Sequence, residues 1–468
     1  MKINRAGAVK VPSSSKKKPN RTSKVAIKAP PVQKTSSVRI SPCNPTVLFC
    51  TVCTICFFSL LICFFVSHGN LIEHYFFRDI RDTGMDFFHS IEYTRGQKPY
   101  EIFNTLYPPL ANLFFYLLYL FVPTSYSDTW TYDFNESVSF RGTDLDLRTY
   151  QSTMLLFILF ILLTSIFLFC LIQRLLNKRV STWLSSWASL CMLLGYGCLT
   201  AFERGNIVVF VTALCLFFVS FYRSHNKIVR EVALIALAVA AGLKLYPALL
   251  GILLLREKNK FPAIRAIIYG IATLVFPTFV FEGIEAIPAW LSIVTSWGKD
   301  STVNWIGTGF SQIMTHISRW MSALIGYHLI DAWFPLVGAV VCALLCVCAL
   351  RLPKAWQSVS ALILAMLLFQ SQASYSLCLF CIPLALFLVQ ERKITKNNWG
   401  PFLFLTLLTA NVPLFYQYGI SHPRETLTQI ILLSFSGWLI IKTILCILKN
   451  RETLSRSTFS AIKRKETN

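Results

Sequence analysis

Long apolar runs restrict this chain to one kind of fold. The ranges 45–66, 151–172 and 427–448 each supply the roughly 20 predominantly apolar residues that a helix needs to cross a bilayer. Hydrophobic residues make up 54% of the chain and charged residues only 14%, against roughly 25% in soluble globular proteins. The runs are continuous rather than alternating, so they predict an all-α, polytopic membrane protein.

Hydropathy and loop charge together predict about twelve spanning helices. Their ranges are 45–66, 151–172, 181–201, 206–222, 231–244, 246–255, 262–281, 329–350, 356–370, 375–390, 399–415 and 427–447. The short connections between them are basic, and basic loops mark the cytoplasmic side of a membrane. We refer to five of these connections as the basic loops: 174–179, 223–230, 256–260, 351–354 and 391–396.

The predicted topology leaves a long first external loop, 67–150, with amphipathic helices in it. Within this loop the range 107–123 is apolar but short, and counting it as a span would invert everything after it. A re-entrant or interfacial helix there preserves the charge rule. The predicted domains are therefore a disordered basic cytoplasmic tail (1–40), a transmembrane domain (41–448) and a second basic cytoplasmic tail (449–468).

The net charge of +22 indicates a membrane partner rather than a nucleic acid. Residues 1–39 hold eleven Lys or Arg and no acidic residue, while 449–468 hold six basic and two acidic residues. Both tails flank membrane spans, where basic residues contact anionic headgroups. Nucleic-acid binding would favour interleaved aromatic residues, which the tails almost lack. We expect an integral, multi-pass protein with both termini in the cytoplasm, located in the inner membrane if the host is bacterial.

Asp86 is the first candidate for chemistry, because it follows the first span and lies close to the predicted membrane surface. A carboxylate there could accept a proton from a substrate hydroxyl. The alternative is that Asp86 only caps an amphipathic helix, since Asp is a preferred N-cap residue. No clustered Cys and His ligands, phosphate-binding glycine loop or cytoplasmic nucleotide-binding domain is evident. The sequence therefore predicts no metal and no cofactor.

Several motifs resemble those of glycosyltransferase family 87, whose members are multispanning GT-C enzymes. Their sequences are Asp86-Phe-Phe-His-Ser, Gly96-Gln-Lys-Pro99-Tyr100, Tyr107-Pro108-Pro109-Leu110, Phe202-Glu-Arg204-Gly205-Asn206 and Ala240-Ala-Gly-Leu-Lys244-Leu-Tyr246-Pro247. The resemblance implies a GT-C-like fold and transfer of a hexose, mannose by default, from a polyprenyl-phosphate sugar. The acceptor would be a glycolipid or glycan, and the anomeric configuration would invert.

The resemblance also implies roles for individual residues. Asp86 would be the catalytic base on the non-cytoplasmic face. The donor phosphate or the acceptor would contact Tyr100, Tyr107, Arg204, Asn206, Lys244, Tyr246 and Asn304. Arg204 and Lys244 fall at predicted span ends, where a lipid phosphate would lie. Equally, such cations could merely extend to the membrane interface.

Two elements depart from the family pattern. Asn304-Trp-Ile-Gly-Thr-Gly-Phe matches an Asn-Gln-Ser-x-x-Gly element only loosely. The family element Ser-x-x-Ser-Trp-x-His appears as Ser371-Gln-Ala-Ser374-Tyr375-Ser376-Leu377, with leucine where the family has histidine. His89 or His316 could take the place of that histidine, but nothing in the sequence shows it.

Two alternatives remain open at this level. A transporter or flippase of lipid-linked glycans would place charges near the midplane and show inverted repeats. A polysaccharide polymerase or ligase would use a late external loop, such as 282–327.

Overall fold

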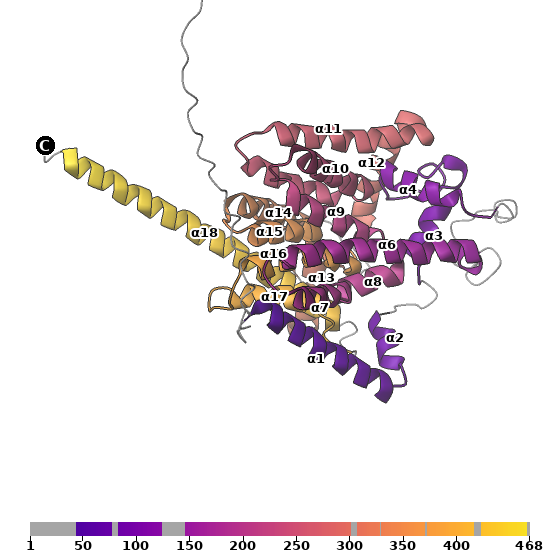
Figure 1. Ribbon diagram of the computed structural model, residues 1–468, viewed down its shortest axis with the longest axis horizontal. Coiled ribbons are helices and arrows are strands. Elements are labelled where there is room, and N and C mark those ends of the chain that lie inside the picture. The colour runs from indigo at the N-terminus through magenta and orange to yellow at the C-terminus, as the bar shows by residue number, and fades with distance from the viewer. Residues whose placement is uncertain are drawn as a thin grey trace, which may run out of the picture. The chain divides into compact units, whose positions relative to one another are not determined.

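The computed structural model describes residues 44–76, 83–123, 146–300, 307–327, 329–369, 372–415 and 423–465. Within these ranges every regular element is an α-helix or a 3₁₀ helix, so the all-α prediction is confirmed (Figure 1). The predicted disordered tail, 1–40, lies outside the described residues.

The α-helices are α1 (Pro45–Val66), α2 (Asn70–Phe76), α3 (Met85–Glu92), α4 (Pro109–Tyr119), α6 (Gln151–Leu176), α7 (Thr182–Leu193), α8 (Tyr196–Arg204), α9 (Val208–Phe221), α10 (Lys227–Leu243), α11 (Phe261–Val275), α12 (Ala286–Asp300), α13 (Phe310–Ile325), α14 (Phe334–Arg351), α15 (Ala355–Phe369), α16 (Cys381–Gln390), α17 (Trp399–Thr409) and α18 (Pro423–Lys465). The 3₁₀ helices are η2 (Arg95–Gln97), η3 (Leu147–Thr149), η4 (Tyr246–Arg256), η5 (Phe276–Val280), η6 (Gly283–Glu285), η7 (Asp331–Trp333) and η8 (Ser374–Phe380).

Five helices in the described ranges are long and apolar enough to cross a membrane. They cover Pro45–Val66, Gln151–Leu176, Phe261–Val280, Asp331–Arg351 and Pro423–Lys449. Counting α7 and α8 as one bent span makes six. Shorter apolar helices occupy most of the other predicted spans, so the polytopic character is confirmed while the count of twelve stays a prediction. Helix α4 has 11 residues, about 16 Å of helix, which is too short to cross a bilayer.

The predicted span 181–201 is broken rather than continuous. Helices α7 and α8 meet at an angle of 54°. A Cβ on Gly195 would lie 2.5 Å from the carbonyl oxygen of Thr409, so only glycine allows α17 to end this close. The Leu194 carbonyl beside the break accepts a hydrogen bond from Asn411 Nδ2 at 2.5 Å. The break therefore leaves that backbone group satisfied, as a membrane interior requires.

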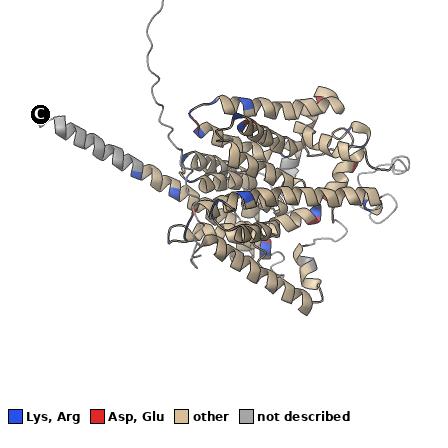
Figure 2. Ribbon diagram, viewed as in Figure 1, with Lys and Arg blue, Asp and Glu red and all other residues tan. Residues whose placement is uncertain are grey.

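The five basic loops lie together at one end of the helix bundle, which we call the basic end. Arg179 Nε donates to the Val389 carbonyl at 2.9 Å, and Arg256 Nη1 donates to Ser358 Oγ at 2.6 Å. Ion pairs join Arg223 to Glu257 and Lys354 to Glu391. Figure 2 shows most of the blue Lys and Arg on the side of the bundle from which α18 extends. This clustering agrees with the predicted topology, while the cytoplasmic orientation itself stays a prediction.

Helices α3 and α4 lie at the opposite end of the bundle (Figure 1). Helix α3 docks there through Phe87, which is fully buried. The Phe87 ring lies 5.1 Å from the Phe160 ring, 5.4 Å from the Phe157 ring and 6.2 Å from the Phe115 ring. These contacts attach α3 to α4 and to the first half of α6, so the residue beside Phe87 has a defined position.

Candidate active site

That neighbouring residue is Asp86, whose carboxylate is held from two sides by the end of α8. Arg204 donates to Asp86 Oδ1 through Nη2 at 2.7 Å and through Nε at 3.2 Å. Asn206 Nδ2 donates to Asp86 Oδ2 at 2.7 Å. The Asp86 side chain is 18% exposed and the Arg204 side chain 28%. Two separate sequence motifs, one with Asp86 and one with Arg204 and Asn206, therefore meet in one site.

Two glycines allow α3 and α8 to come this close. Gly84 is the N-cap residue of α3 with φ +75°, and Gly205 is the C-cap residue of α8 with φ +66°. A Cβ on Gly205 would lie 2.8 Å from Phe87 Cβ and 2.7 Å from Phe157. The Gly84 amide donates to the Glu203 carbonyl at 2.7 Å. The backbones of the two helix ends are therefore in direct contact beside the carboxylate.

Asp86 does not cap α3, so the alternative interpretation of this residue is wrong. Gly84 occupies the N-cap position and Asp86 lies in the first turn. The Asn206 amide has a fixed orientation, because its Oδ1 accepts the Val208 backbone amide at 3.0 Å and its Nδ2 therefore faces Asp86. Asn206 is 1% exposed. The Asn206 donor to the carboxylate is thus preorganised.

Lys244 follows the last residue of α10 and contacts two aromatic rings. Its Nζ lies 5.4 Å from the centroid of the Tyr107 ring and 5.1 Å from that of the Tyr375 ring. It also interacts electrostatically with the Asp86 carboxylate. Among the residues that the structure describes, none forms a hydrogen bond or an ion pair with the Lys244 ammonium. Besides the Asp86 charge, the contacts of this ammonium within the described ranges are with ring faces, which attract cations more weakly than a directly paired anion would.

Tyr107 connects the ammonium to the rest of the site. Burial raises the pKa of its hydroxyl well above the ordinary value of 10.0, and the charge of Asp86 raises it further. The phenol therefore stays neutral and can donate a hydrogen bond at any physiological pH. Tyr100, which is 2% exposed, donates to the Tyr107 carbonyl at 3.0 Å. Tyr100 thus supports the loop that carries Tyr107.

Two predicted site residues remain, Tyr246 and Asn304. Tyr246 begins η4 two residues after Lys244, and its hydroxyl is buried. Asn304 lies outside the described residues.

Tyr375 was missed as a site residue, although its motif keeps an aromatic residue where the family has tryptophan. Leu377, at the family's histidine position, is 2% exposed in the core. The His89 ring stacks on Tyr93 at 5.7 Å, and His316 Nδ1 lies 3.2 Å from Gln429 Oε1.

These features define a polytopic helical membrane protein with a charged site at the end of its bundle opposite the basic loops. The model of glycosyltransferase family 87 matches residues 105–377, more than half of the chain. The chain therefore belongs to glycosyltransferase family 87, and it is a membrane glycosyltransferase. The matched range includes Tyr107, Arg204 and Lys244, whereas Asp86 and Tyr100 precede it. A search of curated proteins finds no match.

Proposed function

We propose that this glycosyltransferase moves a hexose, with mannose as the first choice, from a polyprenyl-phosphate sugar to an acceptor hydroxyl. The acceptor is a glycolipid or glycan, and the reaction takes place on the non-cytoplasmic face. The predicted topology supports that face, because the site lies at the end of the bundle opposite the basic loops.

The Lys244 ammonium carries this proposal. A positive charge bordered by the Tyr107 and Tyr375 rings, without an ion-pair partner among the described residues, is suited to an anionic group of a substrate. The phosphate of a lipid-linked donor is such a group, and it lies at the depth where membrane helices end. The Tyr107 phenol, which stays neutral, can donate a further hydrogen bond.

Asp86 serves as the base in the proposed reaction. A carboxylate oxygen can accept about two hydrogen bonds, and Oδ2 accepts one from Asn206. The remaining position on Oδ2 is available to the acceptor hydroxyl. As that proton moves to Asp86, the acceptor oxygen forms a bond to the anomeric carbon. The bond from this carbon to the phosphate oxygen breaks, so the configuration inverts and polyprenyl phosphate leaves.

Positive charge near the leaving group lowers the barrier, because negative charge develops on the phosphate in the transition state. Lys244 supplies that charge. Arg204 holds the Asp86 carboxylate in position and adds a second positive charge to the same site. The two residues thus act on opposite ends of the displacement, one on the leaving phosphate and one on the base.

The test uses full-length wild type, Asp86→Asn and Asp86→Glu in nanodiscs. Each protein is incubated with radiolabelled polyprenyl-phosphate mannose, glucose or galactose and a membrane lipid extract. We expect transfer from one donor by the wild type and a loss of about 10²–10⁴-fold in Asp86→Asn, the usual contribution of a general base. Lys98→Ala is the control, because it removes an exposed ion pair with Glu101.

Two results would reject parts of the proposal. Full activity in Asp86→Asn would remove Asp86 as the base while leaving the donor class intact. Transfer that requires a nucleotide sugar instead of any lipid-linked sugar would reject the donor class.

A further inference from the structure

An ion pair at the start of α6 fastens the loop immediately before α3. Asp146 and Arg148 belong to the turn that contains η3, and they form a bidentate pair. Arg148 Nε lies 2.9 Å from both carboxylate oxygens of Asp146, and Nη2 lies 2.5 Å from Oδ2. The Asp146 side chain is 7% exposed and the Arg148 side chain 18%. Such a forked, shielded pair fixes the direction of the guanidinium.

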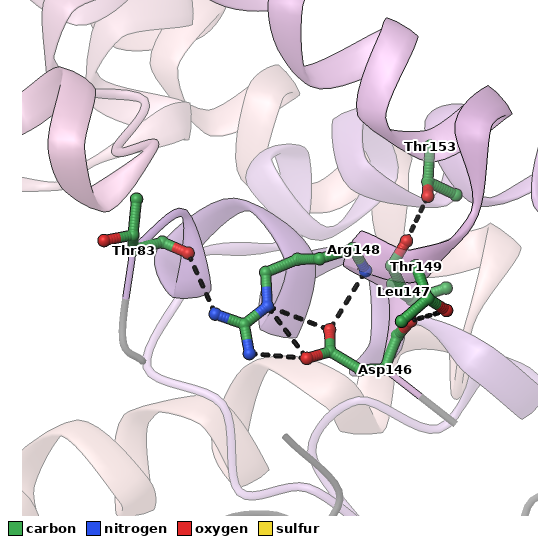
Figure 3. A network of polar contacts seen from close by, with 6 residues as sticks. All are labelled: Thr83, Asp146, Leu147, Arg148, Thr149 and Thr153. Carbon is green, nitrogen blue, oxygen red and sulfur yellow. Dashed lines mark hydrogen bonds and ion pairs between the residues drawn. The ribbon is translucent and has the colours of Figure 1, made fainter. Parts of the chain in front are cut away.

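The third nitrogen of the same guanidinium reaches across to the α3 loop. Arg148 Nη1 donates to the Thr83 carbonyl at 3.3 Å, and Figure 3 shows the guanidinium between Asp146 and Thr83. Thr83 lies three positions before Asp86. Its hydroxyl also donates to Glu203 Oε1 at 3.4 Å, beside the Arg204 that binds the carboxylate. The loop before Asp86 is thus held from both α6 and α8.

The Asp146–Arg148 ion pair is itself held in place by hydrogen bonds at the start of α6. The Asp146 carboxylate accepts the Arg148 backbone amide at 3.0 Å, and Thr149 Oγ1 donates to the Asp146 carbonyl at 2.7 Å. Thr153 of α6 donates to the Leu147 carbonyl, as Figure 3 also shows. These bonds make η3 a rigid extension of α6, so the position of Arg148 follows that helix.

We infer that Arg148 and Asp146 are positioning residues for the transfer reaction. Asp146 orients Arg148, and Arg148 fixes the position of Asp86 through its hydrogen bond to the Thr83 carbonyl. This inference rests on the proposed function. Helix α3 has only eight residues, and its N-cap Gly84 provides no side-chain hydrogen bond. The start of α3 therefore depends on contacts from other elements. Arg148 contacts Thr83 from the turn before α6, whereas Arg204 contacts Asp86 from the end of α8. Neither Arg148 nor Asp146 needs to touch the substrate.

The experiment compares Arg148→Ala, Arg148→Lys and Asp146→Asn with the wild type, as full-length proteins in nanodiscs. A misplacement of about 1 Å can cost about 10²-fold in rate, so kcat of Arg148→Ala should fall by that order while the donor KM changes little. Arg148→Lys retains one donor for Thr83 and should recover part of kcat. Arg223→Ala, which removes an exposed ion pair at the basic end, is the matched arginine control.

Amide hydrogen exchange supplies a readout that does not depend on the donor. In Arg148→Ala, exchange in the peptide 84–92 should rise, while exchange in α10, which leads to Lys244, should stay the same. Asp146→Ala combined with Arg148→Ala should be no worse than Arg148→Ala alone, because the pair acts as a unit.

The results separate this inference from the proposed function. Unchanged exchange in 84–92, or unchanged kcat despite faster exchange, would overturn the positioning role. If Asp86→Asn kept full activity, the proposed base would be lost whatever Arg148→Ala did. A fall in kcat accompanied by an equal fall in melting temperature and faster exchange throughout the bundle would make Arg148 a structural residue only, which also overturns the inference.

Discussion

The two ends of the helix bundle both carry charged residues, but they use them differently. At the basic end, ion pairs join neighbouring loops, and at least one partner is well exposed. Arg223 is 56% exposed in its pair with Glu257, and Lys354 is 48% exposed in its pair with Glu391. Exposed pairs of this kind contribute little to stability.

At the α3 end, the charges come from distant parts of the chain and are more enclosed. Asp86 and Arg204 are 118 positions apart, and their side chains are 18% and 28% exposed. Lys244 contacts aromatic rings instead of a carboxylate. The difference teaches that chemistry is to be sought where packing brings separate charges together and leaves one of them without a direct ion pair among the described residues. The number of charges is a poorer guide.

The sharpest test of this contrast replaces one lysine at each end of the bundle with glutamine. Lys442 lies 4.5 Å from the Trp438 ring and feels the charges of Lys354 and Glu391, so it too contacts an aromatic ring. We expect Lys244→Gln to lower kcat/KM by about 10²–10³-fold, as loss of one group that stabilises developing charge does. Lys442→Gln should retain wild-type activity. Steady-state transfer assays decide this, and equal losses in the two variants would contradict the contrast.

A second test compares glycines. Gly205→Ala places a Cβ against Phe87 and Phe157 at a positive φ, so we expect a loss of about 1–3 kcal/mol of stability together with loss of activity. Gly400, in the first turn of α17, has no atom within 4 Å of an added Cβ. Gly400→Ala should leave the apparent melting temperature unchanged or raise it. A stable, active Gly205→Ala variant would show that the close contact of α3 and α8 is not required.

The smallest expected effect concerns pH at the basic end. Burial acts to raise the pKa of Glu391, but hydrogen bonds from Lys354 and Trp356 lower it below its ordinary value of 4.5. A lowered folded-state pKa gives stability that is present above pH 4.5 and is lost as the pH falls through the folded-state value. Glu391→Gln should therefore be less stable than wild type at neutral pH, by at most about 1 kcal/mol, and the difference should shrink in acid. Melting temperatures measured between pH 3 and 7 would contradict this if the two curves ran parallel.

The sequence predicts the helices well because the membrane imposes a simple requirement on them. Helix α1 occupies 45–66 as predicted, and α6 begins at residue 151 as predicted. The break at Gly195 was not predicted, because hydropathy averages over it. Its signal is the pair Gly195 and Gly197 within an apolar run. The contact that requires glycine there comes from Thr409, more than 200 residues later, and no local pattern contains it.

The site was predicted in parts rather than as an assembly. The resemblance named Asp86, Arg204, Asn206 and Lys244, but no spacing in the sequence says that Arg204 and Asn206 bind the two oxygens of one carboxylate. That geometry arises from the close contact of two helix ends. Nothing in the sequence singles out Asp146 and Arg148, since a pair two residues apart has no motif of its own.

The separation between Asp86 and Arg204 has a consequence for how the protein is made. A ribosome adds about 5–20 residues per second, so the 118 residues from Asp86 to Arg204 take about 6–24 seconds to synthesise. During that interval the residues of α3 have been synthesised, but the end of α8 that binds the Asp86 carboxylate has not. The nascent chain therefore carries the Asp86 carboxylate without its Arg204 and Asn206 donors, and the candidate active site can assemble only when α8 has been made.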